Sequence, residues 1–290
     1  MGVKVWINGE LCDEAAATVS VFDRGFLYGD SVYEVMRTAG GRPVDLEPHL
    51  ARLARSAQGL MLAVPPSAQL RAAIAATLEA AGNDESYVRV VITRGAGEIG
   101  LDLALARDPR TIIIVKLLQQ PPRELYERGA ALQIVQVQRT SARAIDPALK
   151  SGNYLNSILA LAEARRAGAH EALMCDAAGR VAEGSSSNVF VVKHGAITTP
   201  ALEVGLLRGI TRERILELAR AAGFDVSEGA FGPQDVRGAD EVFITSSIRG
   251  VLPIVRVDGA PIGDATPGPI TRDLMNRYDG YLARFARDGQ

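Results

Sequence analysis

The chain has little of what marks several large protein classes. It has two cysteines in 290 residues, Cys12 and Cys175, far apart and without a neighbouring His/Cys cluster, so neither a disulfide framework nor a zinc site is indicated. No uninterrupted apolar run reaches membrane length. The start, Met1 to Gly9, lacks the charged, apolar and small-residue layout of a signal peptide. We therefore expect a cytoplasmic protein with no membrane partner.

The chain also lacks an excess of one charge. Its formal net charge is −2, and acidic and basic residues are interspersed without a long Lys/Arg block. Such a sequence offers no electrostatic footprint for DNA, RNA or an anionic membrane. We expect small molecules, and no nucleic acid, as its partners.

The apolar content is sufficient for more than one core. With 290 residues, 47% of them apolar, the chain has the length of two ordinary domains. The paired prolines Pro121 and Pro122, followed by Gly129, indicate a connector. We expect a small N-terminal domain over 1–120, a linker over 121–129 and a larger C-terminal domain over 130–290.

Local patterns predict an α+β first domain. Asn8-Gly9 between two short apolar runs favours a tight hairpin. Apolar residues at helical spacing predict helices over 48–62 and 67–81, the second capped by Ser67 and ended by Gly82. Runs rich in Val and Ile predict strands over 87–93 and 111–118.

The second domain is expected to be barrel-like, because many short strands follow one another with few helices. The predicted strands are 132–137, 171–175, 188–192, 241–245 and 251–257, and the predicted helices are 154–167, 211–222 and 269–285.

Three separate segments together match the needs of pyridoxal phosphate. This cofactor requires an amine for covalent attachment, an acid to keep the pyridine nitrogen protonated, and backbone N–H groups for its phosphate. Lys150 stands in Lys150-Ser-Gly-Asn-Tyr-Leu, Glu183 opens Glu183-Gly-Ser-Ser-Ser-Asn, and Ile210 and Thr211 begin a predicted helix. The three requirements are met in a plausible order along the chain.

These motifs resemble the class IV, or fold type IV, aminotransferases over nearly the whole chain. The family includes branched-chain aminotransferases, D-amino acid aminotransferases and aminodeoxychorismate lyase. The resemblance implies pyridoxal 5′-phosphate as cofactor, a two-domain fold with a small α/β and a larger barrel-like domain carrying Lys150, and a homodimer. It also implies pocket residues that cross from the partner, from the loop around Arg94 to Asp102.

The resemblance assigns roles to individual cofactor residues. Lys150 is expected to attach the cofactor and to move the proton, Glu183 to face the pyridine nitrogen, and Tyr154 to reach the ring hydroxyl. The residues expected to bind the phosphate are Arg52, Ile210, Thr211 and Ser247.

The expected substrate pocket mixes two signatures. Tyr33, Val35 and Arg37 alternate onto one face of a strand, with a Tyr-Glu-Val typical of D-amino acid enzymes and an arginine typical of branched-chain enzymes. Tyr87 and Arg89 match the Tyr-x-Arg of branched-chain enzymes. The Arg and His with which D-amino acid enzymes hold the carboxylate are missing from 97–101.

One turn departs from the branched-chain pattern. Where those enzymes have Gly-Thr-Ala-Ala-Glu, this chain has Ser246-Ser-Ile-Arg-Gly250, which brings Ile248 and Arg249 to the pocket. Arg249 either binds the second carboxylate of a dicarboxylic substrate or points to solvent. Arg208 raises the same question.

The sequence thus predicts transamination between a branched-chain-like α-amino acid and 2-oxoglutarate. The alternatives are a D-amino acid aminotransferase with an atypical pocket, or a carbon–carbon lyase on the same cofactor, although Ile99 replaces the loop arginine of the lyase. A scaffold without catalysis is disfavoured, because Lys150 and Glu183 are both present.

Overall fold

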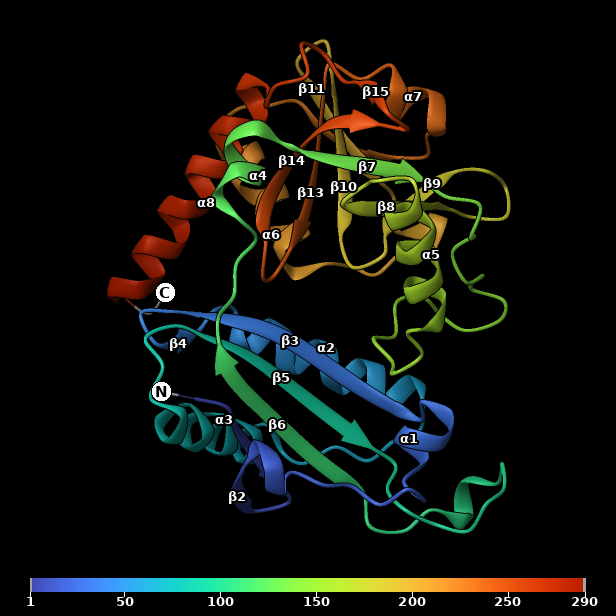
Figure 1. The fold of residues 1–290 in the computed structure, drawn as a ribbon, viewed down its shortest axis with the longest axis vertical. Coiled ribbons are helices and arrows are strands. Elements are labelled where there is room, and N and C mark those ends of the chain that lie inside the picture. Colours follow the sequence, from blue (N-terminus) through green and yellow to red (C-terminus); the bar gives the residue numbers. More distant parts are fainter. Residues whose placement is uncertain (1, 289–290) are drawn as a thin grey trace. The chain divides into compact units, whose positions relative to one another are not determined.

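The computed structural model describes residues 2–288 and divides the chain into two compact units. The first comprises Met1–Gln119, Leu149–Tyr154 and Leu282–Gln290, and the second comprises Gln120–Ala148 and Leu155–Tyr281. Each unit is built on its own sheet (Figure 1).

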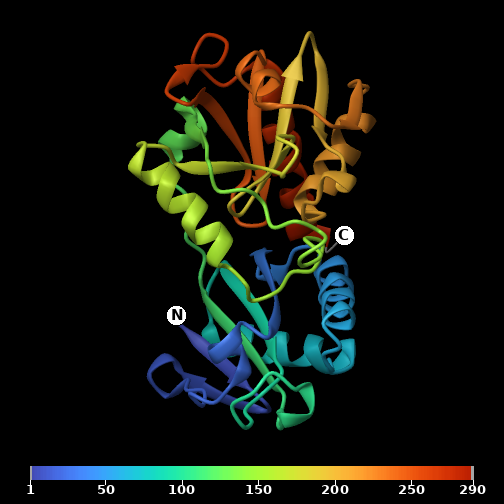
Figure 2. The ribbon, with the colours of Figure 1, turned by 90° about the vertical axis from the view of Figure 1, so that its right-hand side faces the viewer.

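The first unit is a six-stranded antiparallel sheet in the order β2-β1-β6-β5-β3-β4. Its strands are β1 (Lys4–Ile7), β2 (Glu10–Asp13), β3 (Ser31–Ala39), β4 (Arg42–Pro43), β5 (Ser86–Thr93) and β6 (Arg110–Leu117). Its helices are α1 (Arg24–Tyr28), α2 (Leu46–Gly59) and α3 (Ser67–Ala81), with short 3₁₀ turns at Glu14–Ala16 and Leu103–Leu105. Helices α2 and α3 lie together on one face of the sheet (Figure 2).

The alternation of side chains along β3 and β5 separates a packed face from a functional face. Val32 and Met36 of β3 and Val88 of β5 are fully buried and pack with Leu53 of α2 and Ile74 of α3. Burying an aliphatic side chain of this size stabilises the fold by about 1.5–3 kcal/mol. The residues between them on each strand point to the opposite face, away from α2 and α3.

Turn residues end these elements as the sequence indicated. Asn8 and Gly9 both have positive φ, 46° and 109°, and form the tight loop between β1 and β2. Gly82 ends α3 in the left-handed region at φ 59°. Ser67 differs from the expectation, because it is the first helical residue and Pro66 takes the N-cap position without a side-chain hydrogen bond.

The second unit contains a nine-stranded mixed sheet in the order β12-β11-β10-β13-β14-β7-β8-β9, with β15 pairing with β14. The strands are β7 (Ala130–Ile134), β8 (Glu171–Cys175), β9 (Val181–Gly184), β10 (Asn188–Lys193), β11 (Ala196–Pro200), β12 (Val226–Gly229), β13 (Glu241–Ser246), β14 (Gly250–Val257) and β15 (Ala260–Pro261). Parallel pairing joins β11 to β12 and β7 to both β14 and β8.

This sheet curls on itself. Strand β9, at one end of the strand order, also lies against β10 and β11, which stand near the other end. The enclosed core joins residues from distant strands, among them Leu132, Val189, Ile244 and Leu252. The barrel-like second domain predicted from the sequence is therefore confirmed.

Helices surround the second sheet. They are α4 (Arg123–Arg128), α5 (Leu155–Arg166), α6 (Ile210–Ala221), α7 (Pro233–Arg237) and α8 (Pro269–Asp288), with a 3₁₀ turn at Leu202–Val204. In place of a linker over 121–129, the structure has α4, whose Leu125 and Tyr126 pack on the core of the second unit. Pro122 stands at the N-cap of this helix, where a missing N–H costs nothing.

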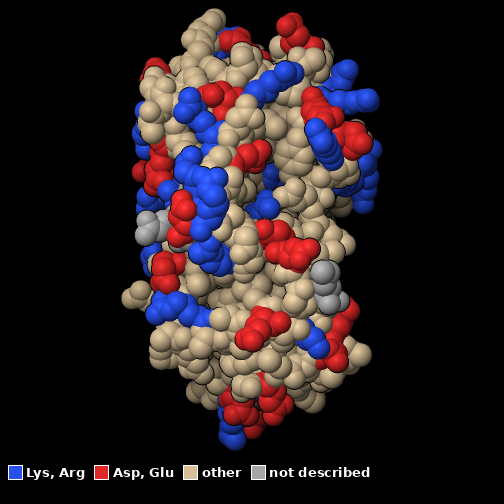
Figure 3. All heavy atoms as spheres, turned by 90° about the vertical axis from the view of Figure 1, so that its left-hand side faces the viewer, with Lys and Arg blue, Asp and Glu red and all other residues tan. Residues whose placement is uncertain are grey.

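The surface carries both charges. On the face drawn in Figure 3, Lys and Arg side chains are interspersed with Asp and Glu, and neither sign covers a large continuous area. Within residues 2–288, no helix is long and apolar enough to span a membrane. The cytoplasmic location stays a prediction.

Candidate active site

Lys150 lies in a non-helical segment that is held against β3. The backbone oxygen of Lys150 accepts from Tyr33 N at 3.0 Å, and its N–H donates to the hydroxyl of Ser56 on α2 at 3.0 Å. Gly152 N donates to Ser31 O at 2.8 Å, and a Cβ at Gly152 would stand 2.2 Å from the Ser31 hydroxyl oxygen. The glycine in this motif thus permits the close approach of the two backbones.

This placement differs from the expectation that the C-terminal domain carries Lys150. Leu149–Tyr154 belongs to the first unit, although residues on both sides belong to the second. The physical reason is the set of backbone hydrogen bonds to β3, which the sequence does not show. The Nζ atom of Lys150 lies 4.5 Å from the centre of the Tyr33 ring.

The five candidate substrate residues of the first unit share one face of β3 and β5. Val35 pairs directly with Arg89, and Arg37 pairs with Tyr87, while Tyr33 stands two positions before Val35. Directly opposed residues in an antiparallel pair point to the same side of the sheet. The structure therefore brings these five side chains together, on the face opposite α2 and α3.

Tyr154 joins this group by a route that the sequence did not predict. Helix α5 begins at Leu155, so Lys150 and Tyr154 are not one helical turn apart, and our reasoning from helical spacing was wrong. Tyr154 instead packs on Tyr33 with ring centres 5.0 Å apart. The guanidinium carbon of Arg89 lies 4.6 Å from the centre of the Tyr33 ring and 5.7 Å from that of Tyr154.

The tyrosines of this cluster are held in their neutral form. Burial raises the pKa of Tyr33, and the Tyr154 hydroxyl beside it raises this pKa further. Burial also raises the pKa of Tyr154, although Tyr33 and Arg89 oppose the rise. Both hydroxyls therefore remain hydrogen-bond donors at neutral pH.

Arg52 is fixed by a buried carboxylate on β3. Its Nε donates to Glu34 Oε1 at 2.6 Å and its Nη2 to Glu34 Oε2 at 2.7 Å, while His49 Nδ1 lies 2.7 Å from Glu34 Oε2. Burial favours the neutral form of Glu34, but Arg52 and His49 outweigh it and lower its pKa to about 2. The ion pair orients the guanidinium, and a phosphate-binding role for Arg52 stays a prediction.

Glu183 lies on β9 in the second unit and is buried, with 7% of its surface exposed. Arg139 Nε donates to its Oε1 at 2.6 Å, and the backbone N–H of Leu207 donates to its Oε2 at 3.1 Å. Sequence reasoning missed Arg139, because it stands 44 residues before Glu183 in an irregular segment. The two contacts favour the ionised carboxylate and fix its direction.

The start of α6 presents backbone donors. Gly209 is the N-cap and provides no side-chain cap, and within residues 2–288 the backbone N–H groups of Ile210 and Thr211 have no acceptor. Asn188 Nδ2 donates to Leu207 O at 2.9 Å, which fixes the preceding loop. A Cβ at Gly209 would lie 1.9 Å from the side-chain oxygen of Asn188, so only glycine fits.

The turn from Ser246 to Gly250 lies between β13 and β14 and holds Ser247 and Ile248, which are partly buried. Arg249 has different partners from the substrate carboxylate that we considered. Its Nη1 donates to Glu171 Oε2 at 2.7 Å, its Nη2 to Ser186 Oγ at 2.6 Å and its Nε to Ser246 Oγ at 3.1 Å. It therefore does not point to solvent either. Arg208 is exposed and pairs with Glu213 at 2.7 Å.

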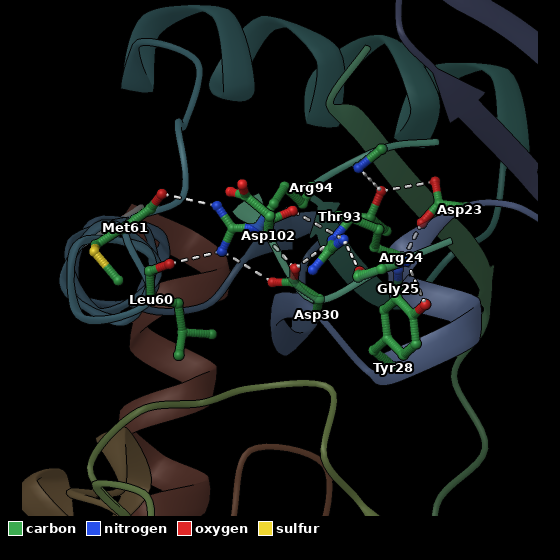
Figure 4. Close-up of polar contacts among 12 residues, drawn as sticks. Asp23, Arg24, Gly25, Tyr28, Asp30, Leu60, Met61, Thr93, Arg94 and Asp102 are labelled. Atoms are coloured by element: carbon green, nitrogen blue, oxygen red, sulfur yellow. Dashed lines mark hydrogen bonds and ion pairs between the residues drawn. The ribbon is translucent and has the colours of Figure 1, made fainter. Parts of the chain in front are cut away.

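The loop after β5 is fastened by Asp30, which lies between two arginines (Figure 4). Arg24 joins Asp30 to the carbonyl of Gly100, and Arg94 joins it to the carbonyls of Leu60 and Met61. Burial raises the pKa of Asp30, but the hydrogen bonds and charges of Arg94 and Arg24 outweigh it, so the pKa lies below its usual value. The network gives this loop a defined conformation.

Comparison with known proteins gives a consistent result. Residues 31–257 match the family model described as Amino-transferase class IV. A protein of Methanocaldococcus jannaschii, whose naming as a branched-chain-amino-acid aminotransferase is provisional, is 37% identical over 98% of both chains. The D-alanine aminotransferase of Listeria innocua is 34% identical over 97% of both chains.

Solved structures agree. The branched-chain amino acid aminotransferase of Escherichia coli superimposes with a TM-score of 0.93 at 29% identity, covering 97% of this chain and 95% of the other. A second branched-chain amino acid aminotransferase, solved with pyridoxamine 5′-phosphate and from a source abbreviated T.th., gives a TM-score of 0.93 at 30% identity over 98% of this chain and 95% of that one.

Proposed function

Because the chain belongs to the class IV aminotransferases, we propose that it exchanges the amino group of an apolar, branched-chain-like α-amino acid with 2-oxoglutarate. Aminotransferase activity and the cofactor pyridoxal 5′-phosphate follow from the family. The choice of substrates is our proposal, and the surroundings of Arg89 carry it.

Arg89 is a partly buried guanidinium whose partners are aromatic. It is surrounded by Tyr33, Tyr87 and Tyr154, and no carboxylate of residues 2–288 forms an ion pair with it. A cation that is partly removed from water without a counter-ion favours an anionic ligand. The distal carboxylate of 2-oxoglutarate or glutamate would supply that charge, and Val35 and Ile248 would accept an apolar side chain.

The residues of the chain fit the cofactor. The open start of α6, with Gly209 too crowded for any side chain, offers Ile210 and Thr211 N–H groups to a phosphate. In our proposal Ser247 and Arg52 bind the same phosphate. Other residues of the second unit do not need to supply charge there, because the helix dipole does so.

The remaining roles concern the reaction itself. Bound pyridoxal phosphate supplies an electron sink for the carbanion that transamination requires. Lys150 attaches the cofactor and, when released, moves a proton on its Nζ atom. Glu183, held by Arg139, keeps the pyridine nitrogen protonated, and the neutral hydroxyl of Tyr154 donates to the ring oxygen.

A D-amino acid aminotransferase is the second candidate. It is supported by the D-alanine aminotransferases among the relatives and by Tyr33-Glu-Val35 on β3. The holoenzyme should be mixed with single amino acids, and the visible absorbance of the cofactor followed. Conversion by L-leucine or L-valine, and not by D-alanine, is expected. Conversion by D-alanine alone would replace the leading proposal with the second.

We also propose a homodimer. Phe22 and Phe26 are 50% and 68% exposed, and Ile99 and Leu101 on the fastened loop are 72% and 82% exposed. The two segments lie side by side, since Asp23 pairs with Ala96 and Gly97 N donates to Phe22 O. A continuous apolar surface of this kind favours a protein interface. Sedimentation of Phe26→Glu should show monomers where the unchanged protein shows dimers.

A further inference from the structure

Glu171 is a buried carboxylate that serves the turn after Glu183. It is the first residue of β8, which pairs with β9 so that Met174 stands opposite Glu183. Only 1% of its surface is exposed. Its Oε1 accepts from the Ser185 N–H at 3.1 Å and from the Ser185 hydroxyl, and its Oε2 accepts from the Ser187 hydroxyl at 3.3 Å.

Arg249 closes the same arrangement from the turn between β13 and β14. It donates to Glu171 Oε2, and its Nη2 also reaches the carbonyl oxygen of Ser186 at 3.2 Å. Its backbone carbonyl accepts from the Tyr126 hydroxyl at 2.9 Å. The side chain is only 18% exposed, and that of Glu171 is 2% exposed. One ion pair therefore connects two turns that are far apart in sequence.

These contacts compensate the charge of Arg249. Nε, Nη1 and Nη2 all donate within the second unit, and Glu171 supplies the opposite charge. Attraction for a second, external carboxylate is correspondingly reduced, because the pair has no net charge. The planar guanidinium is well suited to hold several acceptors in fixed directions.

We propose that Glu171 and Arg249 form a positioning pair, which locks the Ser185–Ser187 turn to the Ser246–Ile248 turn. Through the first turn it fixes Glu183, and through the second it fixes Ser247 and Ile248. The inference rests on the proposed roles of these three residues. It replaces the idea that Arg249 binds the distal carboxylate of a dicarboxylic substrate.

The test uses Arg249→Met, Glu171→Gln and the double variant Glu171→Gln/Arg249→Met in the holoenzyme. We measure kcat and KM with 2-oxoglutarate and with pyruvate, and the pH dependence of the cofactor's visible absorbance. Arg249→Met is expected to lower kcat for both acceptors by the same factor, roughly ten- to a hundredfold, because a small displacement of the site is costly. The absorbance transition should move to a different pH.

Two further variants sharpen the result. Arg249→Lys keeps the charge without the guanidinium fork and should restore part of kcat. Arg256→Met changes an exposed arginine of β14 and should behave as the unchanged enzyme. If the single variants do not fold, the double variant decides, because it leaves no unpaired buried charge.

Specific outcomes would overturn the proposal. A loss confined to 2-oxoglutarate would mean that Arg249 binds its distal carboxylate. A folded double variant with unchanged kcat and absorbance would show that the pair positions nothing. Glu183→Gln is measured in parallel: if it is as active as the unchanged enzyme, the role of Glu183 fails, whereas a slow Glu183→Gln beside a fast Arg249→Met contradicts the positioning pair alone.

Discussion

Arg89 and Arg249 are both partly buried arginines, and the sequence marks both as candidate substrate ligands, yet the regions around them differ in kind. Arg89 lies among three tyrosines without an ion pair to any carboxylate of the described chain. Arg249 is paired with Glu171 and hydrogen-bonded to two serines. The comparison teaches that an arginine's availability to a substrate depends on whether the fold already supplies its counter-ion.

The same distinction extends to other cations. Arg52 is held by Glu34, and Arg139 is held by Glu183. Lys150, in contrast, has its Nζ atom near the face of the Tyr33 ring, in the cluster that contains Arg89. Paired arginines fix the geometry, whereas the cations of the tyrosine cluster are the candidates for contact with ligands.

The largest effect is expected at Lys150, because it removes the reactive amine from the tyrosine cluster. Lys150→Ala should abolish turnover and the visible absorbance of the attached cofactor, while the fold remains. Absorbance and activity of the purified variant check this. Lys116, whose Nζ lies 5.1 Å from the centre of the Tyr87 ring, provides the matched control. Loss of attachment in Lys116→Ala, with Lys150→Ala unaffected, would exchange their roles.

The second effect tests a paired carboxylate. Glu183→Gln should leave the cofactor bound but slow proton abstraction by orders of magnitude, because a neutral amide no longer favours the protonated pyridine. Single-turnover rates measure the step directly. Glu183→Asp, which keeps the charge, should be milder. Equal rates for Glu183→Gln and the unchanged enzyme would remove Glu183 from the chemistry.

The third effect concerns the arginine without an ion pair. Arg89→Leu should raise the KM for 2-oxoglutarate about tenfold or more, since a charge-assisted hydrogen bond contributes roughly 1.5–3 kcal/mol. The KM for an apolar amino acid should change less. Arg55→Leu, at an exposed position of α2, is the control. Unchanged kinetics in Arg89→Leu would show that its cationic charge does not serve the substrate.

The smallest effect on catalysis, but a large one on stability, is expected at Glu34. Its folded-state pKa of about 2 lies below the ordinary value of 4.5, so its contribution is present above pH 4.5 and is lost as the pH falls through 2. Breaking this buried pair by Glu34→Gln should cost about 3–5 kcal/mol near neutral pH. Denaturant unfolding at several pH values checks this. The difference between variant and unchanged protein should shrink toward pH 2, and a constant difference would contradict the assignment.

Local sequence signals predicted much of the fold. The Asn8-Gly9 hairpin, the helix ending before Gly82 and the strand from Glu171 to Cys175 depend on neighbouring residues alone. Strand β9 was not predicted, because its four residues carry no alternation and its pairing with β8 is set by the fold. The segment over 121–129 was misread, since paired prolines favour a helix start as well as an extended linker.

The candidate site shows the same limit. Tyr33, Val35 and Arg37 were placed on one face correctly, because the period of a strand is local. The partners of the charged groups were not predicted: Arg139 stands 44 residues from Glu183, and Arg249 stands 78 residues from Glu171. Sequence identifies a charged side chain, but the fold decides which opposite charge reaches it.

The two faces of β3 set a constraint on how this enzyme could change its substrate over evolutionary time. Val32, Glu34 and Met36 are fully buried toward the helices, while Tyr33, Val35 and Arg37 occupy the other side. Inserting or deleting one residue would exchange the two sets and destroy both the core and the pocket. New specificities are thus accessible through substitutions at the odd-numbered positions, and a directed-evolution library should vary Val35 and Arg37 while leaving the even-numbered positions untouched.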